Sequence, residues 1–140
     1  MHGTMLIDTN ILLSFLLDQN DVKSTEKFLV NTERQKISLK MLDFALYSTC
    51  VALDRLGEEQ LIKELILTIE KLQNIEIIKP KTEEILEALI YKVNLDFDDR
   101  LHYYFSRKYN LNFISYDGDF KKTDIKIYTP KEALNLLGLS

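Results

Sequence analysis

The chain has 140 residues, of which 46% are hydrophobic and 29% are charged, and its formal net charge is −4. These values predict one folded domain over residues 1–140 and exclude a disordered chain. No apolar stretch approaches the roughly 20 residues of a membrane-spanning helix, so no membrane partner is expected. The N-terminus lacks the pattern of a signal peptide, and Cys50 has no second cysteine to pair with. A cytoplasmic protein is therefore expected.

The first half of the chain predicts a strand followed mainly by helices. A short β-like run ends at Asp8, and Asp8, Thr9 and Asn10 are each suited to cap the next helix. Further along, a helix that is apolar nearly all round predicts a buried element, with Gly57 as its stop. An amphipathic helix follows it. The predicted strands are 4–7 and 36–39, and the predicted helices are 11–17, 22–34, 42–56 and 58–72.

The second half repeats the alternation of strand and helix. Pro80 closes one strand, Thr82 is suited to cap the next helix, and Pro130 opens a final helix that Gly138 closes. The predicted strands are 75–78, 112–116 and 125–128, and the predicted helices are 82–93, 98–109 (or 99–109) and 130–138. This order predicts an α/β fold, a three-layer α/β/α sandwich with a short, mostly parallel sheet.

Three acids fall where such a sheet binds ligands, beyond the carboxyl ends of its strands. Asp8 ends the first strand, Asp117 follows a later strand, and Asp99 lies at the start of a helix. Carboxylates brought together repel one another unless a cation is present, and hard cations such as Mg²⁺ or Mn²⁺ prefer oxygen ligands. A metal held in this way can activate water and stabilise charge on a phosphoryl oxygen, which is the chemistry of phosphodiester hydrolysis.

Each acid also has a purely structural interpretation. Asp8 is a helix cap in that interpretation, and Asp98 with Asp99 supplies a cap and a favourable charge at a helix N-terminus. The Asp117-Gly118-Asp119 sequence is typical of a turn. Taken singly, these interpretations are favoured, but the predicted position of all three groups on one sheet edge favours a site.

Two segments resemble the motifs of PIN domains. The opening MLIDTNILLSFL resembles the first motif, a short strand followed by Asp-Thr-Asn and an apolar helix. The segment LDFDDRLHYYFSRKYNLNFISYDGDF resembles the second half, with an Asp-x-Leu-His helix and then a strand ending in a Ser/Thr-x-Asp-x-Asp-Phe motif. The order and spacing match over nearly the whole chain. The resemblance implies the α/β/α sandwich and Mg²⁺- or Mn²⁺-dependent cleavage of RNA.

The resemblance also implies site residues and partners. Asp8, Asp99 and Asp117 take the positions of the catalytic, metal-binding acids. Asp98 is a less favoured occupant of the second position, and Asp119 is a further metal ligand candidate. Thr9 and Asn10 would support the site through hydrogen bonds. Many family members of this size resemble the toxin half of VapBC toxin–antitoxin pairs, so an antitoxin partner and a homodimer are expected.

The sequence departs from the family pattern at one position. Family members usually carry a Glu early in the helix after the second strand, and the alignment places Ser48 there. Asp43 lies five residues earlier, about 140° away around a helix, and a cap is its favoured role. With Ser48 as a supporting residue, the site would bind metal weakly. The alternative function is a degenerate PIN fold that acts as a non-catalytic RNA- or protein-binding module.

Phosphate contacts are expected from clustered basic residues, because an acidic protein needs a local basic surface to bind RNA. For His102 and the neighbouring aromatic residues, a role in packing is favoured over contact with substrate. The basic candidates are Arg100, Arg107, Lys108, Lys121 and Lys122.

Overall fold

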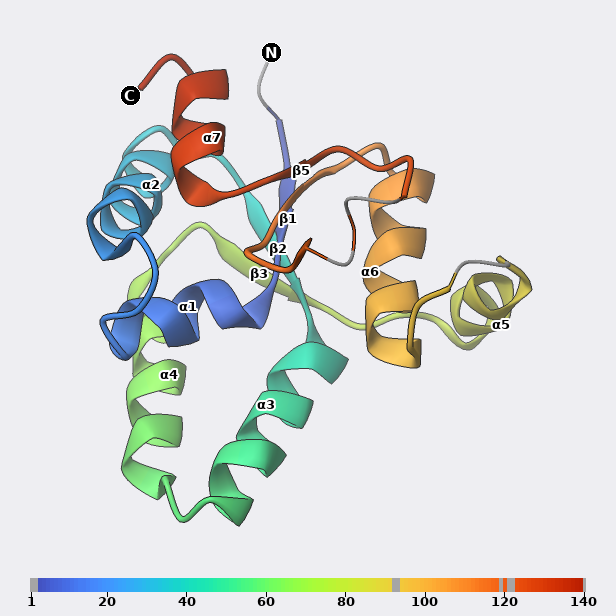
Figure 1. Cartoon of the computed structure of the whole chain (residues 1–140), viewed down its shortest axis with the longest axis horizontal. Coiled ribbons are helices and arrows are strands. Elements are labelled where there is room, and N and C mark those ends of the chain that lie inside the picture. The colour runs from blue at the N-terminus through green and yellow to red at the C-terminus, as the bar shows by residue number, and fades with distance from the viewer. Residues whose placement is uncertain (1–2, 92–93, 119, 121–122, 140) are drawn as a thin grey trace.

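The structure, a computed structural model, describes residues 3–91, 94–118, 120 and 123–139. Within these residues a parallel sheet is surrounded by helices (Figure 1). The strands are β1 (Met5–Ile7), β2 (Leu39–Leu42), β3 (Ile75–Ile78), β4 (Asn112–Ile114) and β5 (Ile127–Tyr128). The helices are α1 (Thr9–Leu16), α2 (Val22–Arg34), α3 (Asp43–Arg55), α4 (Glu59–Lys71), α5 (Thr82–Ile90), α6 (Phe97–Lys108) and α7 (Pro130–Leu136).

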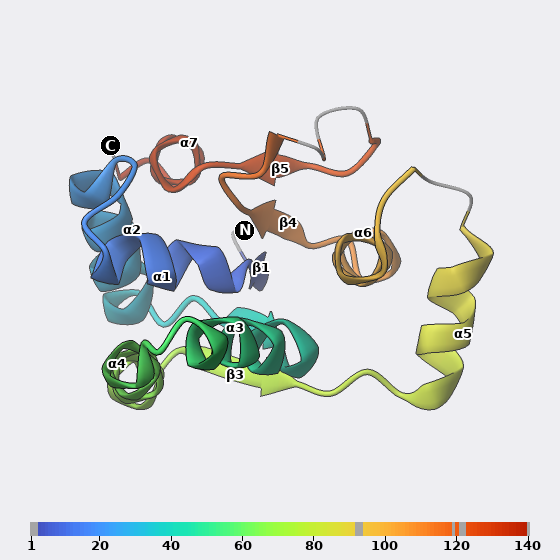
Figure 2. The same cartoon turned by 60° about the horizontal axis from the view of Figure 1, so that its bottom comes forward.

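The sheet separates two hydrophobic cores, because successive residues of a strand point to opposite faces. Met5 and Ile7 of β1 belong to one core, which α1, α2, α4 and α7 cover. Leu6, between them, belongs to the other core, which α5 and α6 cover. Figure 2 shows these helices on the two sides of the strands. The predicted three-layer α/β/α sandwich is confirmed, with every strand pair parallel.

The order of the strands defines where a ligand can bind. Across the sheet the order is β3-β2-β1-β4-β5, so the chain builds outward from β1 on one side and then continues on the other. The switch point lies between β1 and β4, and open parallel sheets bind ligands at the carboxyl ends of the strands there. Asp8 directly follows β1, and Ser115 directly follows β4.

Most predicted elements are confirmed, with shifted ends. The second strand is the main exception: residues 36–39 were the predicted strand, whereas β2 is Leu39–Leu42. The short apolar run that begins at Leu39 does not by itself separate a strand from a helix start. Helix α6 begins at Phe97 with Asp96 as its N-cap, so neither Asp98 nor Asp99 opens it. Helix α5 ends at Ile90 and is preceded by Lys81 as N-cap, so Thr82 is not the cap.

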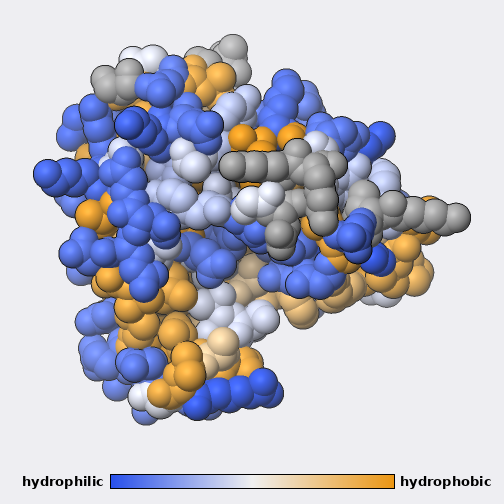
Figure 3. Space-filling model, in the orientation of Figure 1, coloured by the Kyte–Doolittle hydropathy of each residue, from blue (hydrophilic) through white to orange (hydrophobic). Residues whose placement is uncertain are grey.

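The prediction of a buried third helix is wrong. Only Ala45, Leu46 and Leu53 of α3 are buried, whereas Tyr47 is 61% exposed and Val51 is 49% exposed. Figure 3 shows apolar side chains gathering over the lower part of the molecule, where α3 and α4 lie. None of the helices in the described part of the chain is long and apolar enough to cross a membrane.

Candidate functional site

Ser115 connects two of the predicted acids. Ile7 of β1 lies opposite Ile114 of β4 in the parallel register, so the next residues along, Asp8 and Ser115, emerge side by side. The Ser115 hydroxyl donates to Asp8 Oδ2 at 3.0 Å and accepts from the Asp117 backbone N–H at 2.9 Å. Ser115 is buried, and sequence reasoning did not single it out. The Ser/Thr-x-Asp pattern was the signal that could have identified it.

Asp8 caps a helix and also lines the cavity of the candidate site. Its Oδ1 accepts from the Asn10 backbone N–H at 3.2 Å and caps α1, while its Oδ2 meets Ser115. The structural and functional interpretations of Asp8 are therefore compatible, because a carboxylate has several acceptor positions. Thr9 is buried and its hydroxyl has no hydrogen-bond partner in the described part of the chain, whereas Asn10 is exposed.

Asp99 lies in the first turn of α6, at the same edge of the sheet. Its backbone N–H donates to Asp96 Oδ1 at 2.9 Å. Burial of its side chain, together with the charges of Asp96, Asp117 and Asp98, raises the pKa of the Asp99 carboxyl to about 7. The charge of His102 acts in the opposite direction. The carboxylates at this edge are thus close enough to oppose one another's ionisation.

His102 is packed beneath the acids, one turn after Asp98. Its ring is 2% exposed and stacks on Phe113 of β4, with 5.1 Å between ring centroids. Nδ1 lies 3.0 Å from the carbonyl oxygen of Asp98 and 3.3 Å from its Oδ1. Burial lowers the pKa of His102, but contact with Asp98 and the nearby Asp8 charge outweigh burial and leave that pKa above its usual value. The predicted packing role is supported, and Asp98 is engaged with this ring.

Asp43 lies near the predicted acids and does not cap α3, although a cap was its favoured role. It is the first residue of α3, whose N-cap is Leu42, and no side-chain cap bond is present there. Because Leu6 lies opposite Lys40, continuing the parallel register places Asp43 one residue beyond the strand position opposite Asp8. Asp43 is half-buried, whereas Ser48 is exposed on α3. Asp43 therefore lies at the same sheet edge as the predicted acids.

Two of the basic candidates, Arg107 and Lys108, form ion pairs within the chain. The guanidinium of Arg107 contacts Asp124 and donates to the Tyr103 hydroxyl at 2.9 Å. Lys108 pairs with Glu84 at 3.5 Å and with Glu87 at 3.8 Å. Both cations lie at the end of α6 away from Asp99. Their contact with RNA stays a prediction, and any such contact would compete with these ion pairs.

The remaining basic and acidic candidates are less informative. Arg100 is half-buried and donates from Nη2 to the Leu95 carbonyl oxygen at 3.2 Å. Asp119, Lys121 and Lys122 lie outside the described residues. Among the residues that are described, no three His, Cys, Asp or Glu side chains form a group that could hold a metal ion.

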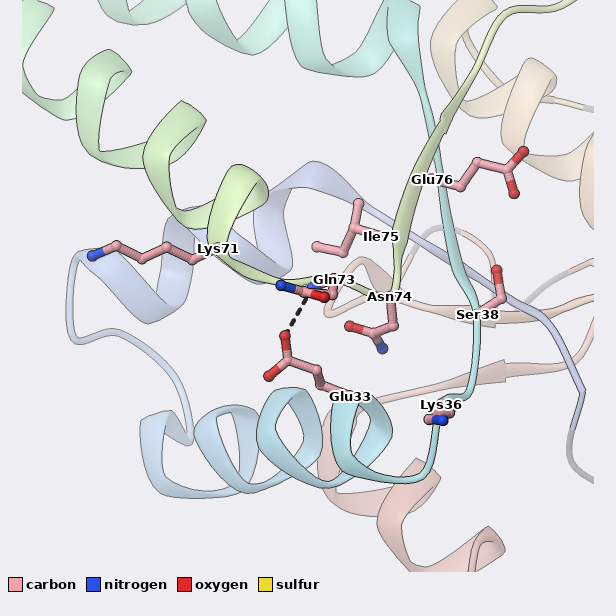
Figure 4. A pocket seen from close by; sticks show the side chains of 8 residues that line it. All are labelled: Glu33, Lys36, Ser38, Lys71, Gln73, Asn74, Ile75 and Glu76. Carbon is pink, nitrogen blue, oxygen red and sulfur yellow. Dashed lines mark hydrogen bonds between the residues drawn. The ribbon is translucent and has the colours of Figure 1, made fainter.

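Two cavities differ in chemistry. A cavity of about 360 Å³ contains Asp8 and Asp117 together. A larger one of about 780 Å³ lies at the opposite sheet edge, where β2 and β3 begin (Figure 4). There Glu33 accepts from the Gln73 backbone N–H at 2.8 Å and Asn74 donates to the Ile37 carbonyl oxygen, so the lining ties neighbouring segments together. The larger cavity also has two carboxylates, but Glu33 is engaged with Gln73 and Glu76 pairs with Lys40 at 2.8 Å, and Figure 4 shows the two pointing apart. The chemistry therefore favours the smaller cavity.

The acids at this edge carry the type of ligand that a hard divalent cation takes, although no three of the described ones are gathered closely enough to form a complete metal site. Its potential ligands are carboxylate oxygens, which Mg²⁺ and Mn²⁺ prefer, and water can complete the coordination. Burial is the main cause of the raised pKa of Asp99, and the negative charges of neighbouring acids add to it; a bound cation would compensate those charges. The candidate ligands for such an ion are Asp8 and Asp117, which line one cavity, and Asp99, whose ionisation the Asp117 charge opposes, with Asp43 as a fourth candidate at the same edge.

The domain is a parallel α/β fold, and its acidic edge lies at the switch point between β1 and β4. Ligands bind at this point in open parallel α/β sheets. The model of the PIN domain matches residues 5–126, so the chain belongs to the PIN-domain family. No curated protein matches the chain.

Solved structures share this fold over most of the chain. One is from VapBC2 of Rickettsia felis bound to a DNA fragment from its promoter, with a TM-score of 0.72 and 14% identity over 90% of this chain and 98% of that one. Another is VapC20 of Mycobacterium tuberculosis, a toxin that cleaves the sarcin-ricin loop, with a TM-score of 0.65 and 13% identity over 86% and 95%. A toxin–antitoxin complex from Klebsiella pneumoniae has a TM-score of 0.61 and 21% identity over 91% and 98%. Identities this low show the fold alone.

Proposed function

We propose that this chain is a divalent-metal-dependent endoribonuclease and the toxin component of a VapBC-type pair. The observation that carries the proposal is the Ser115 hydroxyl between Asp8 and Asp117, two acids that line one cavity at the switch point. Membership of the PIN-domain family supports a nuclease. The VapBC and VapC structures among the neighbours support the toxin assignment.

In this proposal, Asp8, Asp99 and Asp117 bind Mg²⁺ or Mn²⁺ through their carboxylate oxygens. When bound, the ion supplies Lewis-acid stabilisation of the phosphoryl oxygens and an activated water. The Ser115 hydroxyl donates to Asp8 and fixes the carboxylate that faces the substrate, as outer hydrogen-bond partners do in metal sites. Burial and the neighbouring acids raise the pKa of Asp99 to about 7, and a cation held at this site would favour its ionised form.

Cleavage of a mixed RNA pool with Mn²⁺, with Mg²⁺ and with EDTA tests the proposal. Wild-type protein is expected to cleave only with a metal, and Asp8→Asn and Asp117→Asn are expected to lose most of that activity. Asp54→Asn is the matched control, because Asp54 is an exposed acid on α3, away from the site. Equal cleavage by wild type and Asp8→Asn would refute the mechanism.

A protein partner is part of the proposal. Apolar residues stay exposed on α3 and α4, including Tyr47, Val51 and Leu67, and exposed apolar patches are typical of protein interfaces. Because two neighbours come from toxin–antitoxin complexes, we propose an antitoxin as one partner. A homodimer is the second expected assembly, and light scattering of the purified chain tests it.

The alternative function is a non-catalytic RNA- or protein-binding module. The exposed Ser48 at the usual Glu position is the feature that favours it. Well-folded wild-type protein that binds RNA but never cleaves it, with either metal, would support this alternative.

A further inference from the structure

The cavity beside Asp8 and Asp117 extends away from the acids toward α1 and the loop that joins it to α2. Its volume of about 360 Å³ lies in the range of small-ligand sites. Apart from the two acids, every residue that lines it is uncharged: Asn10, Leu13, Ser14, Gln19, Asn20 and Tyr116. A neutral lining does not suit a phosphate, which would need cationic partners. It suits a polar, uncharged and flat group.

One wall of the cavity is apolar and fixed. Leu13 and Tyr116 are half-buried and both line the cavity, and Tyr116 also packs against the core that α1 and α2 cover. The Tyr116 hydroxyl forms a 2.7 Å hydrogen bond with Thr25 Oγ1 of α2, which restrains the aromatic ring. Aromatic rings in such positions stack on unpaired bases in RNA-binding proteins.

Another wall carries amide groups. Asn10, Gln19 and Asn20 are exposed, and each amide offers both donors and an acceptor. The Asn20 amide donates to the Ser14 hydroxyl at 2.9 Å, which uses one of its hydrogens and orients the group. Amide side chains match the donor and acceptor pattern of a base edge.

The loop that presents these amides has a defined backbone conformation. Asp18 and Asn20 both adopt left-handed backbone angles, with φ of 55° and 57°, on either side of Gln19. Asp and Asn accept this conformation more readily than other non-glycine residues, and it occurs often at ligand sites. The Gln19 backbone N–H donates to the Ser14 carbonyl oxygen at 2.9 Å and fixes the loop on α1. The backbone at Gln19 is thus held on α1 before any ligand binds, and its exposed amide is presented at the cavity.

We infer that this cavity is a subsite for one unpaired nucleobase of single-stranded RNA, next to the scissile phosphate. The inference rests on the proposed function, because it takes the phosphate to lie at Asp8 and Asp117. The base would stack against the Tyr116 side, and the amides of Gln19 and Asn20 would contact its edge. The subsite would therefore give the enzyme a base preference on one side of the cleaved bond.

The first test measures base preference. Wild-type protein cleaves a pool of randomised single-stranded RNA with Mn²⁺, and sequencing of the products gives the preference at each position beside the cut. Gln19→Ala should reduce the preference at one position by about tenfold, the lower part of the range for a lost base contact. Asn20→Gly should act similarly, since glycine accepts the left-handed backbone without strain. Gln60→Ala, an exposed amide on α4 outside the cavity, is the matched control.

The second test separates this inference from the proposed function. The four uncharged nucleosides are titrated into wild-type protein in EDTA while NMR follows the side-chain amide signals of Asn10, Gln19 and Asn20, with ribose as control. Saturable shifts with at least one nucleoside, absent with ribose and lost in Gln19→Ala, support the subsite even if no RNA is cleaved. No shift with any nucleoside, or cleavage whose base preference survives both variants, overturns it.

Discussion

At the scale of single residues, Asp99 makes a pH-dependent contribution to stability. Its folded-state pKa of about 7 is higher than the ordinary value of 3.8 for an aspartate, so the folded chain holds this proton more tightly than the unfolded chain. Ionisation therefore favours the unfolded state. The stability that protonated Asp99 contributes is complete below about pH 4 and is lost as the pH rises toward 7.

Replacing Asp99 by Asn should remove this pH dependence. Between pH 4 and pH 7.5, the free energy of unfolding should fall by about 1–2 kcal/mol less in Asp99→Asn than in wild type. This figure is discounted because water reaches this half-buried group. Urea unfolding of both proteins in EDTA, across that pH range, measures the difference. Parallel stability curves for the two proteins would mean that Asp99 is not perturbed by its neighbours.

Asp43 and Ser48 compete for the role of the missing family Glu. They lie about 140° apart around α3, so both cannot face the acids from one helix. The half-buried position of Asp43 after β2 favours Asp43. Asp43→Asn should slow metal-dependent cleavage by about tenfold or more, the effect of a lost supporting group in a metal site. A larger loss in Ser48→Ala than in Asp43→Asn would favour the alignment over the geometry.

At the scale of elements, α6 combines a cap with the acidic site. Asp96 caps the helix by accepting from the Asp99 backbone N–H, and its charge is also one that raises the pKa of Asp99. Asp96→Asn keeps a capping side chain but removes the charge, so the Asp99 pKa should fall in a carbon-detected NMR titration. Asp96→Ala should in addition cost about 1 kcal/mol in the free energy of unfolding. An unchanged Asp99 pKa in both variants would contradict this coupling.

The elements show which sequence signals were sufficient. Strong turn and cap signals placed the final helix well, because Pro130 and Gly138 bound it and Thr129 caps it. Apolar runs were less informative. The residues of β2 were assigned in part to the next helix, since a short apolar run fits either element. The exposed side of α3 was not predicted, because an apolar side chain in the sequence can lie either in the core or on the surface.

At the scale of the whole molecule, the order of the strands determines which residues meet at the candidate site. Asp8, Asp99 and Asp117 come from segments far apart in the sequence, and only the parallel sheet and α6 bring them to one edge. The family motifs predicted these acids, and the register explains Asp8 and Ser115 as neighbours. Ser115 and Asp96 were missed as site residues, and Asp43 was assigned a cap, because the relevance of all three depends on packing between strands and helix starts.

This topology predicts that metal binding stabilises the entire fold. A cation shared by residues after β1, after β4 and at the start of α6 binds only when those elements are assembled, so it favours the folded state. The gain should grow with metal concentration and reach about 2.7 kcal/mol at a hundredfold excess over the dissociation constant. Thermal unfolding with increasing Mn²⁺, and again after EDTA, measures it. Asp8→Asn should abolish most of the shift, whereas Asp54→Asn should keep it. An equal shift in wild type and Asp8→Asn would place the bound metal elsewhere on the protein.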